Sequence, residues 1–156
     1  MDNLRSNNDI IFDKIVLGGT FDRIHKGHLL LFHIAFTLSK EVTIGLTSEF
    51  YLNKYPKKIA PKIIFSYNKR KNQLIQLFDE NQWRNYRVIP IRHPYGLAHI
   101  EDFDAIIGSE ETLSSIIKIN DYRFRSSLNK LKIIIIPKSL SDEGEIYSSS
   151  TLRTKK

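Results

Sequence analysis

The chain has 156 residues and a formal net charge of +7 at pH 7, and it contains no cysteine. This length suits one domain that buries a hydrophobic core, and the missing cysteines exclude disulfides and thiolate–metal sites within these residues. Every apolar run is far shorter than the roughly 20 residues of a membrane-spanning helix. We therefore expect a cytoplasmic protein that does not associate with a membrane.

The positive charge is compatible with two kinds of partner. Lysine and arginine neutralise the phosphates of a nucleic acid backbone, and they also line pockets for small phosphorylated ligands. The basic residues are spread along the chain, apart from a denser stretch between Lys54 and Lys71. No pattern of interleaved basic and aromatic residues indicates a nucleic-acid surface, so we expect small phosphorylated ligands and no nucleic acid.

The predicted elements alternate between strand and helix after a flexible N-terminal leader at residues 1–13. Runs rich in isoleucine and valine predict strands at residues 14–17, 42–46, 86–91, 104–108 and 131–136. Such continuous apolar strands are typical of a parallel sheet covered on both faces. Helical spacing recurs between them, in the sets Leu29, Leu30, Phe32, His33, Phe36 and Thr37; Leu74, Leu77 and Phe78; and Leu113, Ile116, Ile117 and Tyr122.

This alternation predicts one α/β domain at residues 14–156. Its expected architecture is a single Rossmann-like, doubly wound domain with a five-stranded parallel sheet flanked by helices. Ligands of such sheets bind at the carboxyl ends of the strands, where the strand order reverses. The segment after the first strand falls at that edge.

The segment after the first predicted strand has the composition of a phosphate site. The apolar run ends in Gly18-Gly19, and His25 and His28 follow just before a helical run. A strand that turns through glycines into a helix can direct backbone N–H groups at a phosphate. Two imidazoles there add donors for charge that develops during a reaction. A histidine that merely caps the helix, and an ordinary strand–helix turn, are the alternatives, and Asp22 is expected to brace the loop or cap the helix.

Two motifs resemble a known superfamily. Gly18-Gly19-Thr20-Phe21-Asp22 followed by His25-Lys26-Gly27-His28 is similar to the signature of nucleotidyltransferases with an HxGH motif. A second signature of that superfamily has the form Ile-Ser-Ser-Thr-x-x-Arg. Tyr147-Ser148-Ser149-Ser150-Thr151-Leu152-Arg153 resembles it, with tyrosine for the leading isoleucine and Ser150 for the threonine.

Within the superfamily, the chain resembles the archaeal and eukaryotic type of phosphopantetheine adenylyltransferase. The residues that carry the resemblance are Ile44-Gly45-Leu46-Thr47-Ser48-Glu49, Lys54, Tyr67-Asn68-Lys69-Arg70, Ile107-Gly108-Ser109-Glu110-Glu111-Thr112, and Ile119-Asn120 with Arg123. The resemblance extends over nearly the whole chain.

The resemblance implies an enzyme that moves AMP from ATP to 4′-phosphopantetheine, giving dephospho-coenzyme A and pyrophosphate. Mg²⁺ would arrive with ATP, and coenzyme A or dephospho-coenzyme A would bind as a product. The attacking phosphate is already anionic, so direct in-line attack needs no covalent enzyme intermediate. A monomer is favoured over a higher assembly. The alternatives are a nucleotidyltransferase with another phosphorylated acceptor (glycerol 3-phosphate, nicotinamide mononucleotide or FMN) and a non-catalytic nucleotide- or RNA-binding domain.

The resemblance also implies roles for individual residues. The catalytic residues would be His28, His25 and Lys54, and no residue is assigned to a metal. The residues expected to bind ATP are Gly19, Thr20, Phe21, His25, His28, Gly108, Glu111, Ser149, Ser150 and Arg153. The acceptor would be bound by Thr20, Lys54 and Arg70. Lys57, Lys58 and Lys62 compete with Lys54 for the acceptor phosphate, whereas Trp83 and Tyr95 are interpreted as packing residues.

Overall fold

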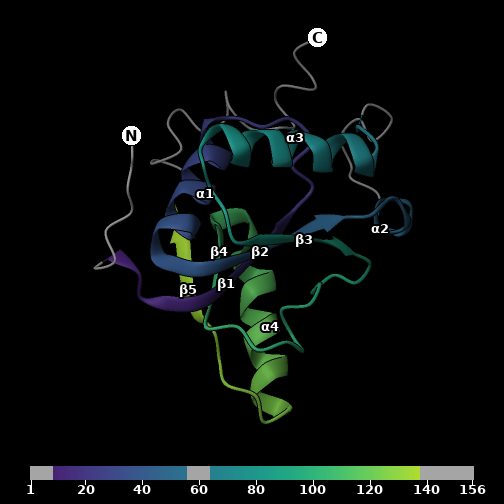
Figure 1. The fold of residues 1–156 in the computed structure, drawn as a ribbon. Coiled ribbons are helices and arrows are strands. Elements are labelled where there is room, and N and C mark those ends of the chain that lie inside the picture. The colour runs from purple at the N-terminus through teal and green to yellow at the C-terminus, as the bar shows by residue number, and fades with distance from the viewer. Residues whose placement is uncertain (1–8, 56–63, 138–156) are drawn as a thin grey trace.

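A five-stranded parallel sheet forms the centre of the computed structural model, which describes residues 9–55 and 64–137 (Figure 1). The strand order is β3-β2-β1-β4-β5, and every neighbouring pair is parallel. The strands are β1 (Phe12–Gly19), β2 (Ser39–Thr47), β3 (Tyr86–Ile91), β4 (Ala105–Ser109) and β5 (Lys132–Ile136). The predicted parallel α/β architecture is confirmed, and β1 begins two residues before the start of the first predicted strand.

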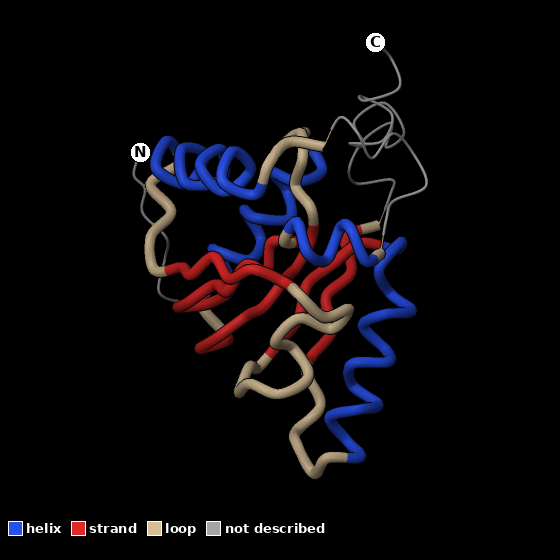
Figure 2. The backbone as a smooth tube through the Cα atoms, turned by 90° about the vertical axis from the view of Figure 1, so that its right-hand side faces the viewer, coloured by secondary structure: helices blue, strands red, loops and turns tan. Residues whose placement is uncertain are grey.

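Helices cover both faces of this sheet, as Figures 1 and 2 show. The long helices are α1 (Lys26–Leu38), α3 (Tyr67–Glu80) and α4 (Leu113–Arg125), and the short ones are α2 (Glu49–Lys54) and the 3₁₀ turn η3 (Glu110–Thr112). α1 and α3 lie on one face, and α4 lies on the other. Among the described residues, no helix is both long and apolar enough to cross a membrane.

The alternation of side chains along β1 divides the core into two parts. Ile15 and Leu17 pack under α1 and α3, together with Phe32 and Phe78. Val16 points to the other face, where it belongs to the cluster that contains Ile116 and Ile119 of α4. Successive residues of a strand face opposite sides of the sheet, so one apolar strand supports helices on both faces.

The apolar stripe predicted for the last helix is partly wrong. Ile117 and Tyr122 are 54% and 43% exposed. The buried face of α4 instead holds Ile116, Ile119, Asn120 and Arg123. The polar pair is buried because its hydrogen bonds are satisfied there: the Asn120 amide donates to the carbonyl of Leu131 and accepts from its N–H, at 2.9 and 2.7 Å. Hydrophobic spacing alone therefore identified Ile116 correctly but placed Ile117 and Tyr122 on the wrong face of this helix.

β1 and β4 separate toward their carboxyl ends. Their pairing ends at Val16–Ile106, whereas β1 stays paired with β2 as far as Gly19–Leu46. β4 likewise stays paired with β5 as far as Ser109–Ile136. The strand order also reverses here, since β2 lies on one side of β1 and β4 on the other. Such a switch point is where doubly wound sheets bind ligands.

Candidate active site

The loop between β1 and α1 is held in place by the ring of Phe21. This ring is 4% exposed, and its centroid lies 5.1 Å from that of Phe32 and 5.2 Å from that of His28. Phe21 has a φ of +47°, which is uncommon for a residue with a side chain. A Cβ on Gly19 would lie 2.9 Å from the Phe21 ring, so the turn requires glycine there. Since the Phe21 side chain is part of the core, the loop can offer a ligand its backbone.

His25 and His28 form a reciprocal cap at the start of α1. The His25 Nδ1 accepts a hydrogen bond from the Gly27 N–H at 3.1 Å, and the His28 Nδ1 accepts from the His25 N–H at 3.3 Å. A neutral imidazole that accepts at Nδ1 carries its proton on Nε2. The cap therefore fixes both rings as Nε2–H donors. The capping alternative and the phosphate role are compatible, because capping uses Nδ1 of each ring, whereas a phosphate would accept from Nε2–H.

Burial keeps His25 neutral near pH 7. It lowers the pKa of His25 from 6.5 to about 4. The two rings stack, with centroids 3.7 Å apart and planes inclined by 26°. Because His25 is neutral, the stacked rings do not repel each other as two imidazolium ions would, so both N–H donors can lie close together. The arrangement suits an anionic ligand with several oxygens.

The low pKa of His25 makes stability depend on pH. The unfolded state binds a proton near pH 6.5 and the folded state only near pH 4, so the free energy of unfolding falls as pH decreases through that window. His25→Asn keeps an oxygen acceptor for the cap but cannot titrate. The free energy of unfolding, measured with urea between pH 7 and 4, should depend less steeply on pH in His25→Asn than in the wild type. The difference in slope should be at most about 1.4 kcal/mol per pH unit. Parallel curves for the two proteins would contradict this.

Asp22 and Arg70 connect the β1–α1 loop to the start of α3. Asp22 is fully buried, pairs with Arg23 and accepts a hydrogen bond from the Phe65 N–H at 2.7 Å. It thus braces the loop, while the cap of α1 is His25. Arg70 is also fully buried; its Nε donates to the Phe65 carbonyl at 2.8 Å, and its Nη1 donates to the Thr20 carbonyl at 3.1 Å. Both side chains thus fix the β1–α1 loop against the segment that leads into α3.

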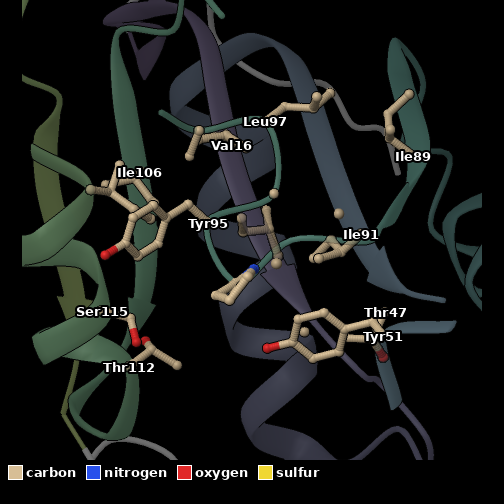
Figure 3. A pocket seen from close by; sticks show the side chains of 18 of the residues that line it. Val16, Thr47, Tyr51, Ile89, Ile91, Tyr95, Leu97, Ile106, Thr112 and Ser115 are labelled. Atoms are coloured by element: carbon tan, nitrogen blue, oxygen red, sulfur yellow. The ribbon is translucent and has the colours of Figure 1, made fainter. Parts of the chain in front are cut away.

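A cavity of about 360 Å³ opens beside this loop, on the α4 face of the sheet (Figure 3). Its walls are mainly apolar and include Val16, Ile89, Leu97 and Ile106. The hydroxyls of Thr112 and Ser115 lie on one side in Figure 3, and Thr47 and Tyr51 lie on the other. Gly18, Gly19 and Thr20 complete the lining at the carboxyl end of β1. An apolar cavity with a few polar groups is typical of a small-molecule site.

The structure brings several of the predicted site residues to this edge. Gly19 and Thr20 line the cavity. Gly108 is the last residue but one of β4. A Cβ there would lie 2.5 Å from the Thr112 Oγ1, so glycine allows η3 to pack closely against the strand. Glu111 is exposed in η3, next to Thr112 of the cavity lining.

The remaining predicted residues lie further from the cavity or outside the described residues. Lys54 is exposed at the end of α2, with its Nζ 5.8 Å from the ring centroid of the cavity-lining Tyr55. Arg70 lies behind Thr20, with its Nη2 buried and without a hydrogen-bond partner among the described residues. Residues outside the described ranges are Ser149, Ser150, Arg153, Lys57, Lys58 and Lys62. The two histidines are not part of the cavity lining and lie beyond Thr20 along the loop.

The sequence analysis assigned no role to Thr47, Tyr51 or Tyr55, which all line the cavity. The sequence did contain a signal for Thr47: Thr43 and Thr47 are the polar residues within the apolar run 42–47, at positions that share a face. Tyr95 does pack against the α4 cluster, as interpreted, and it also lines the cavity. Trp83 stacks on Phe36, with ring centroids 5.1 Å apart.

The fold is a doubly wound α/β domain with a cavity at the switch point of its sheet. A family model described as cytidylyltransferase-like matches residues 16–155. A phosphopantetheine adenylyltransferase from Pyrococcus abyssi is 41% identical over 145 residues, covering 91% of this chain and 89% of that protein. One from Methanopyrus kandleri is 34% identical with the same coverage. The chain belongs to the cytidylyltransferase-like family.

A solved structure has a similar fold. A protein of unknown function from Archaeoglobus fulgidus has a TM-score of 0.71 and 27% sequence identity, and the match covers 79% of this chain and 88% of that one.

Proposed function

We propose that this protein is a phosphopantetheine adenylyltransferase, which transfers AMP from ATP to 4′-phosphopantetheine and releases dephospho-coenzyme A and pyrophosphate. The acceptor is inferred from the relatives named above, at 34–41% identity over most of the chain. The observation that carries the chemistry is the reciprocal histidine cap, which fixes two Nε2–H donors at the N-terminus of α1. The glycine loop beside it can bring backbone N–H groups to the same phosphate.

The proposed reaction is a direct in-line displacement. A phosphate oxygen of the acceptor attacks the α-phosphorus of ATP, a new P–O bond forms, and the bond to pyrophosphate breaks. The nucleophile is already anionic, so the protein needs to position the two phosphates and stabilise the charge. His25 and His28 would donate to the α-phosphate, and Thr20 would contact both phosphates. Lys54 would bring a positive charge to the acceptor. The Arg70 guanidinium, which is fully buried next to Thr20, would add a second positive charge behind the acceptor phosphate.

The substrate is expected to be ATP with Mg²⁺ bound to its phosphates. Among the described residues, no group of three or more histidine, cysteine, aspartate or glutamate side chains is placed to hold a metal. Mg²⁺ often keeps several waters and binds through phosphates, which fits an ion carried by the nucleotide. Ser149, Ser150 and Arg153 remain our candidates for the leaving pyrophosphate. We further propose a cytoplasmic monomer without nucleic acid or membrane partners.

A pyrophosphate-release assay with a panel of acceptors tests this function. The purified protein is mixed with Mg²⁺ and ATP, together with 4′-phosphopantetheine, glycerol 3-phosphate, nicotinamide mononucleotide or FMN. We expect pyrophosphate with 4′-phosphopantetheine, and dephospho-coenzyme A as the product by mass spectrometry. Release with a different acceptor alone would contradict the assigned substrate. Binding of ATP without transfer to any acceptor would favour a non-catalytic nucleotide-binding domain.

A further inference from the structure

Three buried side chains from different segments form a hydrogen-bonded chain at the β1–α1 loop. Arg70 of α3 is fully buried, Thr47 at the end of β2 is 6% exposed, and Thr20 is 9% exposed. The Arg70 Nη1 donates to the Thr47 Oγ1 at 3.2 Å, and the Thr47 Oγ1 lies 3.1 Å from the Thr20 Oγ1. The same Nη1 donates to the Thr20 carbonyl at 3.1 Å. Both the backbone and the side chain of Thr20 are therefore held.

The chemistry of the groups fixes the direction of the first of these hydrogen bonds, and the second runs from Thr47 to Thr20. A guanidinium has donors and no acceptor, so the Thr47 hydroxyl must accept from Arg70. A hydroxyl has a single hydrogen, and in Thr47 that hydrogen points to the Thr20 Oγ1. The Thr20 hydroxyl then accepts, and its own hydrogen is not used within the chain of three. Thr20 and Thr47 both line the cavity, so the Thr20 hydroxyl hydrogen is available to a ligand bound there.

We propose that Thr47 is a positioning residue that, together with Arg70, orients the hydroxyl of Thr20 as a donor to the phosphates. Without Thr47, the Thr20 hydroxyl loses the donor that fills one of its lone pairs and can turn away from the ligand. With Thr47 in place, the Thr20 hydroxyl is oriented before the substrate arrives. It therefore need not reorient when the transition state forms. The inference rests on the proposed role of Thr20 in binding phosphate.

Kinetics of Thr47→Val test the inference. Valine keeps the shape of threonine and suits a strand, but it lacks the hydroxyl. We expect kcat to fall about tenfold and the Kd of ATP, measured by calorimetry, to rise about threefold. Thr47→Ser should restore both values to within about twofold of the wild type. Ser39→Ala is the matched control, because it removes a buried hydroxyl at the other end of β2, bonded to the Ala35 carbonyl and outside the site.

A double-mutant cycle separates this role from a structural one. If Thr47 acts through Thr20, Thr20→Val with Thr47→Val should be no slower than Thr20→Val alone. Two independent losses that multiply, or a kcat of Thr47→Val within twofold of the wild type, would overturn the inference. If Thr47→Val does not fold, Thr47→Ser and Thr47→Ala give the same comparison, because they differ in the hydroxyl alone. If the wild type transfers nothing to 4′-phosphopantetheine, the proposed substrate is wrong. The same double-mutant cycle is then evaluated from the Kd of ATP, which tests the inference on Thr47 independently of the acceptor.

Discussion

Replacement of His28 by alanine is expected to lower kcat for adenylyl transfer about 100-fold or more, while ATP still binds. The reciprocal cap fixes the His28 Nε2 as a donor, and a donor aimed at charge that develops in the transition state lowers the barrier more than it strengthens ground-state binding. The measurement is steady-state kinetics with calorimetric binding of ATP.

Two further variants sharpen this experiment. His28→Asn retains an oxygen that can accept from the His25 N–H, so it separates loss of the catalytic donor from loss of the cap. His33→Ala is the matched control, because His33 is exposed on the same helix and outside the site. A His28→Ala enzyme with unchanged kcat would contradict the proposed role, and so would an equal loss in His33→Ala.

The largest loss of stability is expected for Arg123→Met. Arg123 is 1% exposed and donates to three backbone carbonyls: those of Ala98 at 3.0 Å, Glu101 at 2.6 Å and Asn129 at 2.7 Å. Methionine fills similar space but leaves these carbonyls without their donor. We expect the free energy of unfolding to fall by about 3 kcal/mol, measured by urea denaturation.

Arg125→Met is the control for this change. Arg125 lies two residues further on the same helix, and its side chain is 76% exposed where it pairs with Asp121. Exposed pairs of this kind contribute little, so the free energy of unfolding should change by less than about 0.5 kcal/mol. Equal effects of the two substitutions would show that burial of Arg123 does not stabilise the fold as described.

The parallel sheet and the turn from β1 into α1 could be predicted because their signals are local. Continuous apolar strands such as the one around Val16 belong to a sheet covered on both faces, and Gly19 with His25 and His28 marks the turn into a helix. The family signatures extended this to an activity. These features depend on neighbouring residues and on spacing, which a sequence displays directly.

The remainder of the site depends on contacts between distant segments. The hydrogen-bonded chain joins Thr20, Thr47 and Arg70, and no periodicity relates these positions. The resemblance implied that Arg70 binds the acceptor, but nothing in the sequence indicated that the fold buries it completely. The hydrophobic pattern of α4 could not identify Arg123 as buried either. Buried polar groups are stable where other segments supply their hydrogen-bond partners, and the pattern does not show those partners.

The stereochemical course at the α-phosphorus tests direct transfer of AMP at this edge. ATP made chiral at the α-phosphorus with a sulfur atom is allowed to react with 4′-phosphopantetheine, and the configuration of the product is determined by ³¹P NMR. A single in-line displacement by the acceptor phosphate predicts inversion. Retention would indicate two displacements through a covalent adenylyl–enzyme, and would contradict the mechanism built on Thr20, His25 and His28.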